Sequence, residues 1–165
     1  MEQIGGWMAR DGEMRGEILV GMCRRLGTRE SGRKEAYCQG GIGLLAVGEG
    51  ESFHVCEDSR GRCVLLMTGE TVGDAEAVMS AYHVPGDAFA KRLRGQLSFA
   101  ILDEGRGELI LARSQRGKPL YWSEENGVLV FSSARRGMMS DSFRSLPKGA
   151  YKRFHRLKRA EEENR

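Results

Sequence analysis

The sequence lacks the features that mark several common classes of protein. No stretch approaches the run of about 18 apolar residues that a membrane-spanning helix needs. The first residues contain neither the basic segment nor the apolar segment of a secretory signal. The formal net charge is only +3, which is too small by itself to indicate a nucleic-acid partner. We therefore expect a cytoplasmic protein with no membrane association and no nucleic-acid partner.

Signatures of metal sites and disulfide frameworks are also missing. The four cysteines, Cys23, Cys38, Cys56 and Cys63, form no C-x-x-C pair, and no histidine follows at a zinc-finger spacing. We expect free thiols in a reducing compartment, no metal and no cofactor. Cys56 lies two residues from His54, a spacing that would put a nucleophile and a base on one face of a strand. No third group or motif accompanies the pair, so a structural role is the favoured interpretation for all four cysteines.

What the sequence does contain is the composition and length of one globular domain. Its 165 residues are 40% hydrophobic and 30% charged, which is enough to build a core without disulfides or metals. Apolar residues on one helical face predict a helix over residues 13–26; they are Met14, Ile18, Leu19, Met22 and Leu26. Further helices are predicted over 74–82, with Asp74 as N-cap, and over 88–93.

Short apolar runs separated by turn residues predict strands on both sides of these later helices. They cover residues 4–8, 36–39, 42–47, 53–56, 63–68, 97–103, 109–114, 120–123 and 128–132. Asn126-Gly127 between the last two runs is typical of a tight hairpin. Strands, then helices, then strands again indicate layered packing.

The C-terminal end of the sequence is charged, and we expect a domain over residues 1–150 followed by a charged tail over 151–165. The tail could act as an RNA-binding arm through a basic cluster of Lys152, Arg153, Arg156, Lys158 and Arg159. A solvated, partly frayed helix is the favoured interpretation, because such charge runs are usually solvent-exposed faces.

One long stretch carries a family resemblance. Residues 92–121 read R-L-R-G-Q-L-S-F-A-I-L-D-E-G-R-G-E-L-I-L-A-R-S-Q-R-G-K-P-L-Y. This resembles R-L-x-G-x-F-A-F-A-x-x-D followed by L-x-L-A-R-D-R-x-G-x-K-P-L-Y-Y in the N-terminal domain of asparagine synthetases. V-L-V-F-S-S-A-R-R at 128–136 is similar to the family's next strand, L-x-F-A-S-E-x-K, and the first residues, M-E-Q-I-G-G, to M-C-G-I-A-G. The resemblance covers about residues 1–150.

The resemblance implies a class II glutamine amidotransferase domain with the N-terminal-nucleophile fold. That fold is an α+β, four-layer αββα sandwich of two antiparallel sheets. In the family, a processed N-terminal cysteine attacks the amide of glutamine. An Asn-Gly pair forms the oxyanion hole, and an arginine and an aspartate hold the amino acid.

The nucleophile position departs from the family pattern. Glu2 stands where the family has cysteine, and a carboxylate is a weak nucleophile toward an amide. Removal of the initiator methionine needs a small second residue, so Met1 is expected to remain. We therefore expect no catalytic residue.

The substrate positions are only partly kept. The family's N-G-E reads Thr68-Gly69-Glu70, in which a hydroxyl replaces the side-chain amide donor. The family's arginine has no counterpart, because residues 44–47 read L-L-A-V. Asp74 is retained, although a helix cap is its favoured interpretation. Thr68, Gly69 and Asp74 would form a vestigial glutamine pocket.

Two further departures concern the length of the chain. A helix and a strand that the family places between the two motifs are missing between Glu70 and Asp74, so we expect a truncated sandwich with an opened pocket and an exposed sheet edge. No S-G-G-x-D-S phosphate-binding loop follows, so we do not expect this polypeptide to activate aspartate.

The favoured function is a non-catalytic amidotransferase-like module that binds a partner. The partner would be a separate synthetase-like protein or a second copy of the chain. The alternatives are an active amidohydrolase with an altered nucleophile that supplies ammonia to a synthetase, and an amino-acid sensor that uses the remains of the pocket.

Overall fold

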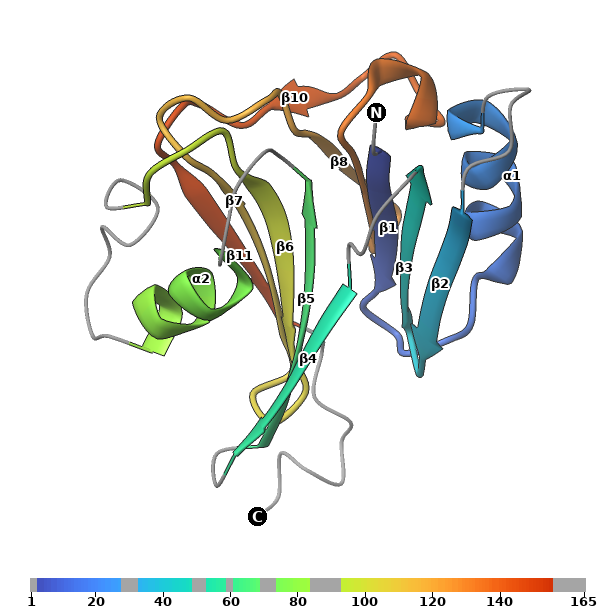
Figure 1. Cartoon of the computed structure of the whole chain (residues 1–165). Helices are drawn as coiled ribbons and strands as arrows, with labels where there is room; N and C mark the ends of the chain where they lie inside the picture. The colour runs from blue at the N-terminus through green and yellow to red at the C-terminus, as the bar shows by residue number, and fades with distance from the viewer. Residues whose placement is uncertain are drawn as a thin grey trace.

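The computed structural model describes residues 3–27, 33–48, 53–58, 61–68, 74–83 and 93–155. Within these ranges the chain forms two antiparallel sheets that face each other (Figure 1). The strand order is β10-β8-β9-β1-β3-β2 in the six-stranded sheet and β11-β7-β6-β5-β4 in the five-stranded sheet. In the described part of the chain, the helices are too short or too polar for any to cross a membrane.

The six-stranded sheet consists of β1 (Gln3–Ala9), β2 (Arg33–Gln39), β3 (Ile42–Gly48), β8 (Tyr121–Glu125), β9 (Val128–Ser132) and β10 (Arg144–Ser145). The five-stranded sheet consists of β4 (Phe53–Asp58), β5 (Gly61–Thr68), β6 (Ser98–Asp103), β7 (Glu108–Arg113) and β11 (Tyr151–His155). The helices are α1 (Gly16–Leu26), α2 (Asp74–His83) and the short 3₁₀ helix η1 (Arg135–Gly137). The nine predicted strands and the helices at 13–26 and 74–82 are thus present, whereas most of the helix predicted over 88–93 lies outside the described residues.

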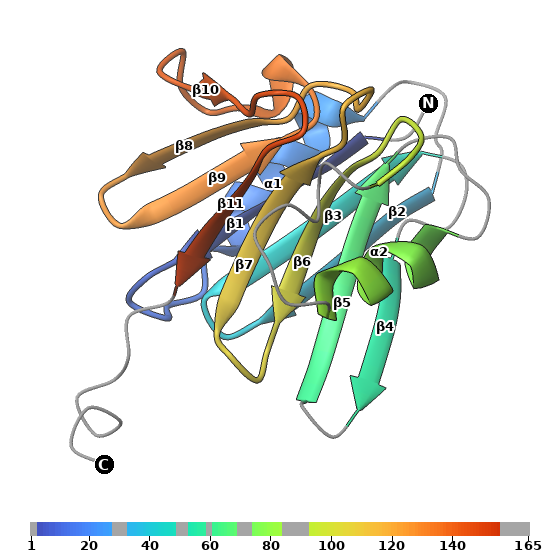
Figure 2. The same ribbon diagram turned by 90° about the vertical axis from the view of Figure 1, so that its left-hand side faces the viewer.

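The alternation of side chains along each strand creates the layers of the fold. On β1, Ile4 and Met8 enter the core between the two sheets, while Trp7 and Ala9 face α1. On β5, Val64 and Leu66 enter the same core, and the intervening side chains pack toward α2. Helix α1 therefore covers one outer face and α2 the other (Figures 1 and 2). The predicted αββα sandwich is confirmed.

The β8–β9 hairpin turns where the sequence predicts. Asn126 and Gly127 adopt positive φ values of 53° and 76°, the left-handed pair that a two-residue hairpin turn requires. Strands β8 and β9 pair on either side of this turn, from Glu125 with Val128 to Tyr121 with Ser132.

Helix α1 begins later than the sequence predicts. Ile18, Leu19, Met22 and Leu26 are buried as expected, but Met14 lies before the helix and is 55% exposed. The prediction that Met14 belongs to the buried face is wrong. The Asp11 carboxylate accepts a hydrogen bond from the Glu13 amide and pairs with Arg15 at 3.0 Å, which holds this segment in a turn before the helix.

The prediction of a helix in the basic tail is wrong over residues 151–155, which form β11. This strand pairs with β7, so the five-stranded sheet extends past residue 150 to His155. Phe154 explains the difference, because it is 3% exposed and packs in the inter-sheet core. The centroid of its ring lies 5.4 Å from that of Trp122. The Lys152 amine lies 4.1 Å from the Trp122 ring centroid. Burial of this one aromatic side chain, Phe154, therefore decides the local structure, and the charged segment forms a strand instead of a solvated helix.

Candidate functional site

Thr68, one of the predicted pocket positions, lies at one end of the sandwich. There β5 and β7 end, β6 begins, and β1 starts (Figure 1). Thr68 is the last residue of β5, is 2% exposed and pairs with Ser98 at the start of β6. Asp74 is the first residue of α2, where the sequence predicts a helix start. Glu2 and Gly69 lie outside the described residues.

Buried serine hydroxyls line this end, and each one donates to a fixed acceptor. Ser98 Oγ donates to the Lys118 carbonyl at 2.5 Å, and Ser114 Oγ to the Gly95 carbonyl at 2.8 Å. Ser132 Oγ donates to the Ala134 carbonyl at 2.7 Å. A nucleophilic hydroxyl needs a base that takes its proton, and among the described residues no histidine contacts these three serines. Their hydroxyls stabilise the local backbone by donating hydrogen bonds to these carbonyls.

The N-terminal strand is fastened at the same end. Ser133 Oγ accepts a hydrogen bond from the Ile4 amide at 2.9 Å and lies 2.7 Å from Gln3 Oε1. The Ser133 amide in turn donates to the Ile4 carbonyl at 2.8 Å. The backbone that leads to position 2 is therefore anchored to β9, as the fold requires of an N-terminal nucleophile, although the sequence places glutamate there.

The stretch that carries the family resemblance contains a clasp that sequence reasoning left without a role. Arg113 Nε donates to the Gly117 carbonyl and its Nη1 to the Leu146 carbonyl, both at 2.9 Å. Ser114 Oγ also accepts from the Leu97 amide at 3.0 Å. Arg113 thereby ties the end of β7 to the following turn and to the segment before β11. An arginine at a strand end followed by a G-x-P turn was the available signal.

Strand β3 contains residues 44–47, where the family resemblance predicts that the substrate arginine is missing. Leu44 and Ala46 point into the inter-sheet core, and Leu45 and Val47 pack toward α1. All four side chains are at most 6% exposed. This part of β3 is apolar on both faces and offers no charge to a substrate carboxylate.

The cysteines do not form a relocated active site in the described part of the chain. All four are free thiols, as predicted. Cys56 and His54 share a face of the edge strand β4, but no hydrogen bond joins them there, and Cys56 is exposed. Burial raises the pKa of the Cys38 thiol, which disfavours the reactive thiolate.

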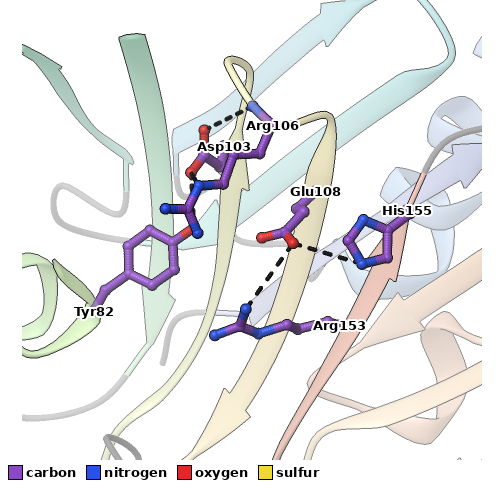
Figure 3. A network of polar contacts seen from close by, with 6 residues as sticks. All are labelled: Tyr82, Asp103, Arg106, Glu108, Arg153 and His155. Carbon is purple, nitrogen blue, oxygen red and sulfur yellow. Dashed lines mark hydrogen bonds and ion pairs between the residues drawn. The ribbon is translucent and has the colours of Figure 1, made fainter. Parts of the chain in front are cut away.

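A second polar cluster lies at the opposite end of the five-stranded sheet (Figure 3). Asp103 and Glu108 are directly opposite each other on β6 and β7, and both are less than 10% exposed. Tyr82 of α2 donates to Asp103 Oδ2 at 2.7 Å. Glu108 Oε1 lies 3.5 Å from His155 and 4.0 Å from Arg153 on β11. The two carboxylates therefore fasten α2 and β11 to the sheet.

We expect Tyr82→Phe to destabilise the protein, because it removes a buried donor from the Asp103 carboxylate. Leaving a buried acceptor without its donor costs about 1–3 kcal/mol. For a chain of this length, each kcal/mol lowers the Tm by roughly 2–4 °C. Thermal unfolding followed by circular dichroism measures the shift. Tyr121→Phe on β8, where the ring alone makes the contacts, is the control with the same chemical change, and an equal shift in both variants would contradict a special role for the Tyr82 contact.

The free energy of unfolding should also fall at alkaline pH. Burial, followed by the hydrogen bond and negative charge of Glu104, raises the pKa of Tyr37 from 10.0 to about 12. The unfolded chain then loses this proton before the folded protein does, so the stabilisation is complete below pH 10.0 and is lost as the pH rises through about 12. Denaturant unfolding across this interval should show a smaller pH dependence in Tyr37→Phe. An unchanged slope in that variant would assign the effect to other groups.

The fold and the anchored N-terminal strand define the class as an N-terminal-nucleophile sandwich, and comparisons with known proteins agree. A model of the glutamine amidotransferase domain matches residues 64–163. The chain therefore belongs to the glutamine amidotransferase domain family.

Individual relatives are similar over parts of the chain. A Mycobacterium bovis protein named as a glutamine-hydrolysing asparagine synthetase is 36% identical over 70 residues, which is 42% of this chain and 11% of that protein. The amidase chry2 of Gibberella zeae is 35% identical over 96 residues, or 56% of this chain and 14% of the enzyme. The solved glutamine phosphoribosylpyrophosphate amidotransferase from B. subtilis superposes with a TM-score of 0.67 at 13% identity, over 96% of this chain and 50% of that one. The chain thus spans at most half the length of these relatives.

Proposed function

We propose that this protein is a non-catalytic glutamine amidotransferase-like module of the cytoplasm that acts by binding a partner chain. The observation that carries the proposal is the chemistry of the pocket end. The serine hydroxyls there donate to fixed acceptors, β3 is apolar where a substrate arginine is expected, and Thr68 stands in place of the oxyanion asparagine. Glu2 stands where the family resemblance predicts the nucleophile. An enzyme would need several of these groups at once.

The surface supports partner binding. In the described part of the chain, β2 and β4 are edge strands, each paired with a neighbour on one side only. Val55 on β4 is 51% exposed, so an apolar side chain and no charge stands at the middle of this strand. The relatives continue well beyond the matched region, and a surface that contacts the rest of a longer protein can serve a separate chain. A synthetase-like protein or a second copy of this chain fits this role.

Association and inactivity are the two expected results. Light scattering at micromolar concentration should give a mass above 18.3 kDa, or a pull-down from the native host should retain a synthetase-like protein. The same preparation should release no glutamate from glutamine beyond a heat-inactivated control. A strictly monomeric protein that retains no partner would contradict the binding role, and glutamate release would contradict the loss of catalysis.

A further inference from the structure

The outer face of the six-stranded sheet is only partly covered by the described helices. Helix α1 packs on β1 and β3, while the β8–β9 hairpin continues the sheet beside it (Figure 2). A hollow of about 480 Å³ lies between α1, this hairpin and residues 138–140. We call this hollow the α1 groove.

The α1 groove has an apolar middle. Ile18 comes from α1, Val128 and Val130 from β9, and Met139 from the segment after η1. Met139 is 59% exposed, which is unusual for a side chain beside other apolar groups. Methionine is a flexible side chain that adapts to the shape of a bound partner.

One end of the α1 groove is basic. Arg25 lines it and donates to the Gly137 carbonyl at 3.2 Å, and Arg136 Nε donates to the Arg25 carbonyl at 3.1 Å. Arg135 and Arg136 belong to η1 beside this end, outside the lining, and the Arg135 guanidinium lies 5.7 Å from the centroid of the Tyr121 ring. None of these three arginines forms an ion pair within the described ranges. Their contacts position the guanidinium groups without neutralising them.

The other end of the α1 groove is different. Glu17, Glu125 and Arg15 line it, and the charge of Arg15 is paired with Asp11 at 3.0 Å, which leaves the two glutamates to set the charge of this end. Ser140 Oγ donates to Glu125 Oε1 at 3.3 Å at this end. The groove therefore runs from an uncompensated basic end, over an apolar floor, to an acidic end. This polarity selects both the chemistry and the direction of an occupant.

A polypeptide segment fits this shape better than a small molecule. Pockets for drug-sized ligands bury roughly 70–90% of the ligand surface, whereas the α1 groove is open along the side where Met139 is exposed. A helix packed beside α1 at the usual interaxial distance of about 8–10 Å would lie on the β8–β9 face. Helix-in-groove recognition uses an amphipathic segment with aliphatic anchors.

We propose that the α1 groove binds an amphipathic helix of a partner chain, with its aliphatic face on Ile18, Val128 and Met139 and its carboxylates at the arginine end. The inference rests on the partner-binding function proposed above and names the surface and the chemistry of the partner. The groove is distinct from the sheet edge at Val55, so the two sites can be tested separately.

Site-specific photo-crosslinking in the native host is the test. The photoreactive residue p-benzoylphenylalanine replaces Met139 in one strain and Val55 in another, and the crosslinked peptide is sequenced by mass spectrometry. We expect a Met139 adduct with a segment of another protein that carries aliphatic residues at helical spacing and carboxylates at one end. Arg135→Glu, which disturbs only the contact with Tyr121, and Arg25→Glu should each lower the adduct yield about tenfold. Arg116→Glu, an exposed arginine elsewhere, should leave it unchanged.

The possible outcomes separate the groove from the general binding role. An adduct at Val55 without one at Met139 would overturn the groove and leave partner binding intact. A Met139 adduct with a second copy of this chain, or one unaffected by both charge reversals, would also overturn the groove. No adduct at either position would contradict the groove and the partner-binding function together.

Discussion

Replacing Glu2 with cysteine should restore the thiol but not glutamine hydrolysis. The Glu2→Cys variant regains the family's nucleophile, and cysteine is small enough to allow removal of the initiator methionine. The oxyanion position still carries Thr68, and the loss of one such donor costs roughly 100-fold to 1,000-fold in rate. The apolar L-L-A-V segment of β3 also leaves the substrate carboxylate without its arginine. We expect glutamate release within the noise of a coupled assay.

A graded series makes this result informative. Glu2→Cys combined with Thr68→Asn restores two of the missing groups and should show any residual activity before either single variant does. Glu2→Ser with Thr68→Asn is the matched control, because it has the same backbone and a weaker nucleophile. An electrophilic thiol probe with peptide mapping would verify that the introduced thiol is accessible. Robust hydrolysis by Glu2→Cys alone would show that the apolar β3 and Thr68 are compatible with catalysis.

Gly117→Ala should be among the most destabilising single substitutions in the described part of the chain. A Cβ at this position would overlap the Leu97 carbonyl oxygen and lie 2.9 Å from Arg113 Cγ. Both neighbours are fixed, the first by the start of β6 and the second by two hydrogen bonds from Arg113. Overpacking against fixed groups costs about 1–3 kcal/mol, and we expect the upper end of this range, a Tm lower by roughly 6–12 °C.

Gly16→Ala is the matched control for this experiment. It adds the same methyl group at the start of α1, where no atom lies within 4 Å of the added Cβ. Alanine also favours the helix over glycine, so its Tm should stay the same or rise. Thermal unfolding of both variants decides the matter. A small shift for Gly117→Ala would mean that the turn can move away from Leu97 and that the Arg113 clasp is not rigid.

Much of the fold follows from local patterns in the sequence. The runs around residues 42–47 and 63–68 are strands because their side chains alternate between two apolar layers. The two departures have local causes. Asp11 delays the start of α1, and Phe154 draws a charged segment into the core. In both cases one residue with a tertiary partner outweighs the average character of its neighbours, and single-sequence patterns contain no information on that partner.

The candidate site was less accessible to sequence reasoning. Resemblance assigned Thr68 and Asp74 to one pocket, and the structure places Thr68 at the end of β5 and Asp74 at the start of α2. It did not reveal that Ser98, Ser114 and Ser132 hold the surrounding backbone, because their acceptors are carbonyls that lie 2 to 20 residues away. The α1 groove was also invisible, since it depends on how α1, the β8–β9 hairpin and residues 138–140 meet in space.

The Arg113 clasp has a consequence for how such proteins are recognised. Its hydrogen bonds and the close approach of Gly117 join the end of β7 to neighbouring backbone segments of the sandwich. Selection for a stable sandwich is therefore enough to preserve this stretch in any family member, whether or not that member hydrolyses glutamine. A sequence search that depends on this stretch identifies the fold but does not report whether the protein is catalytically active. Active and silent members of the family should share this signature equally, and only the residues at the pocket end can tell them apart.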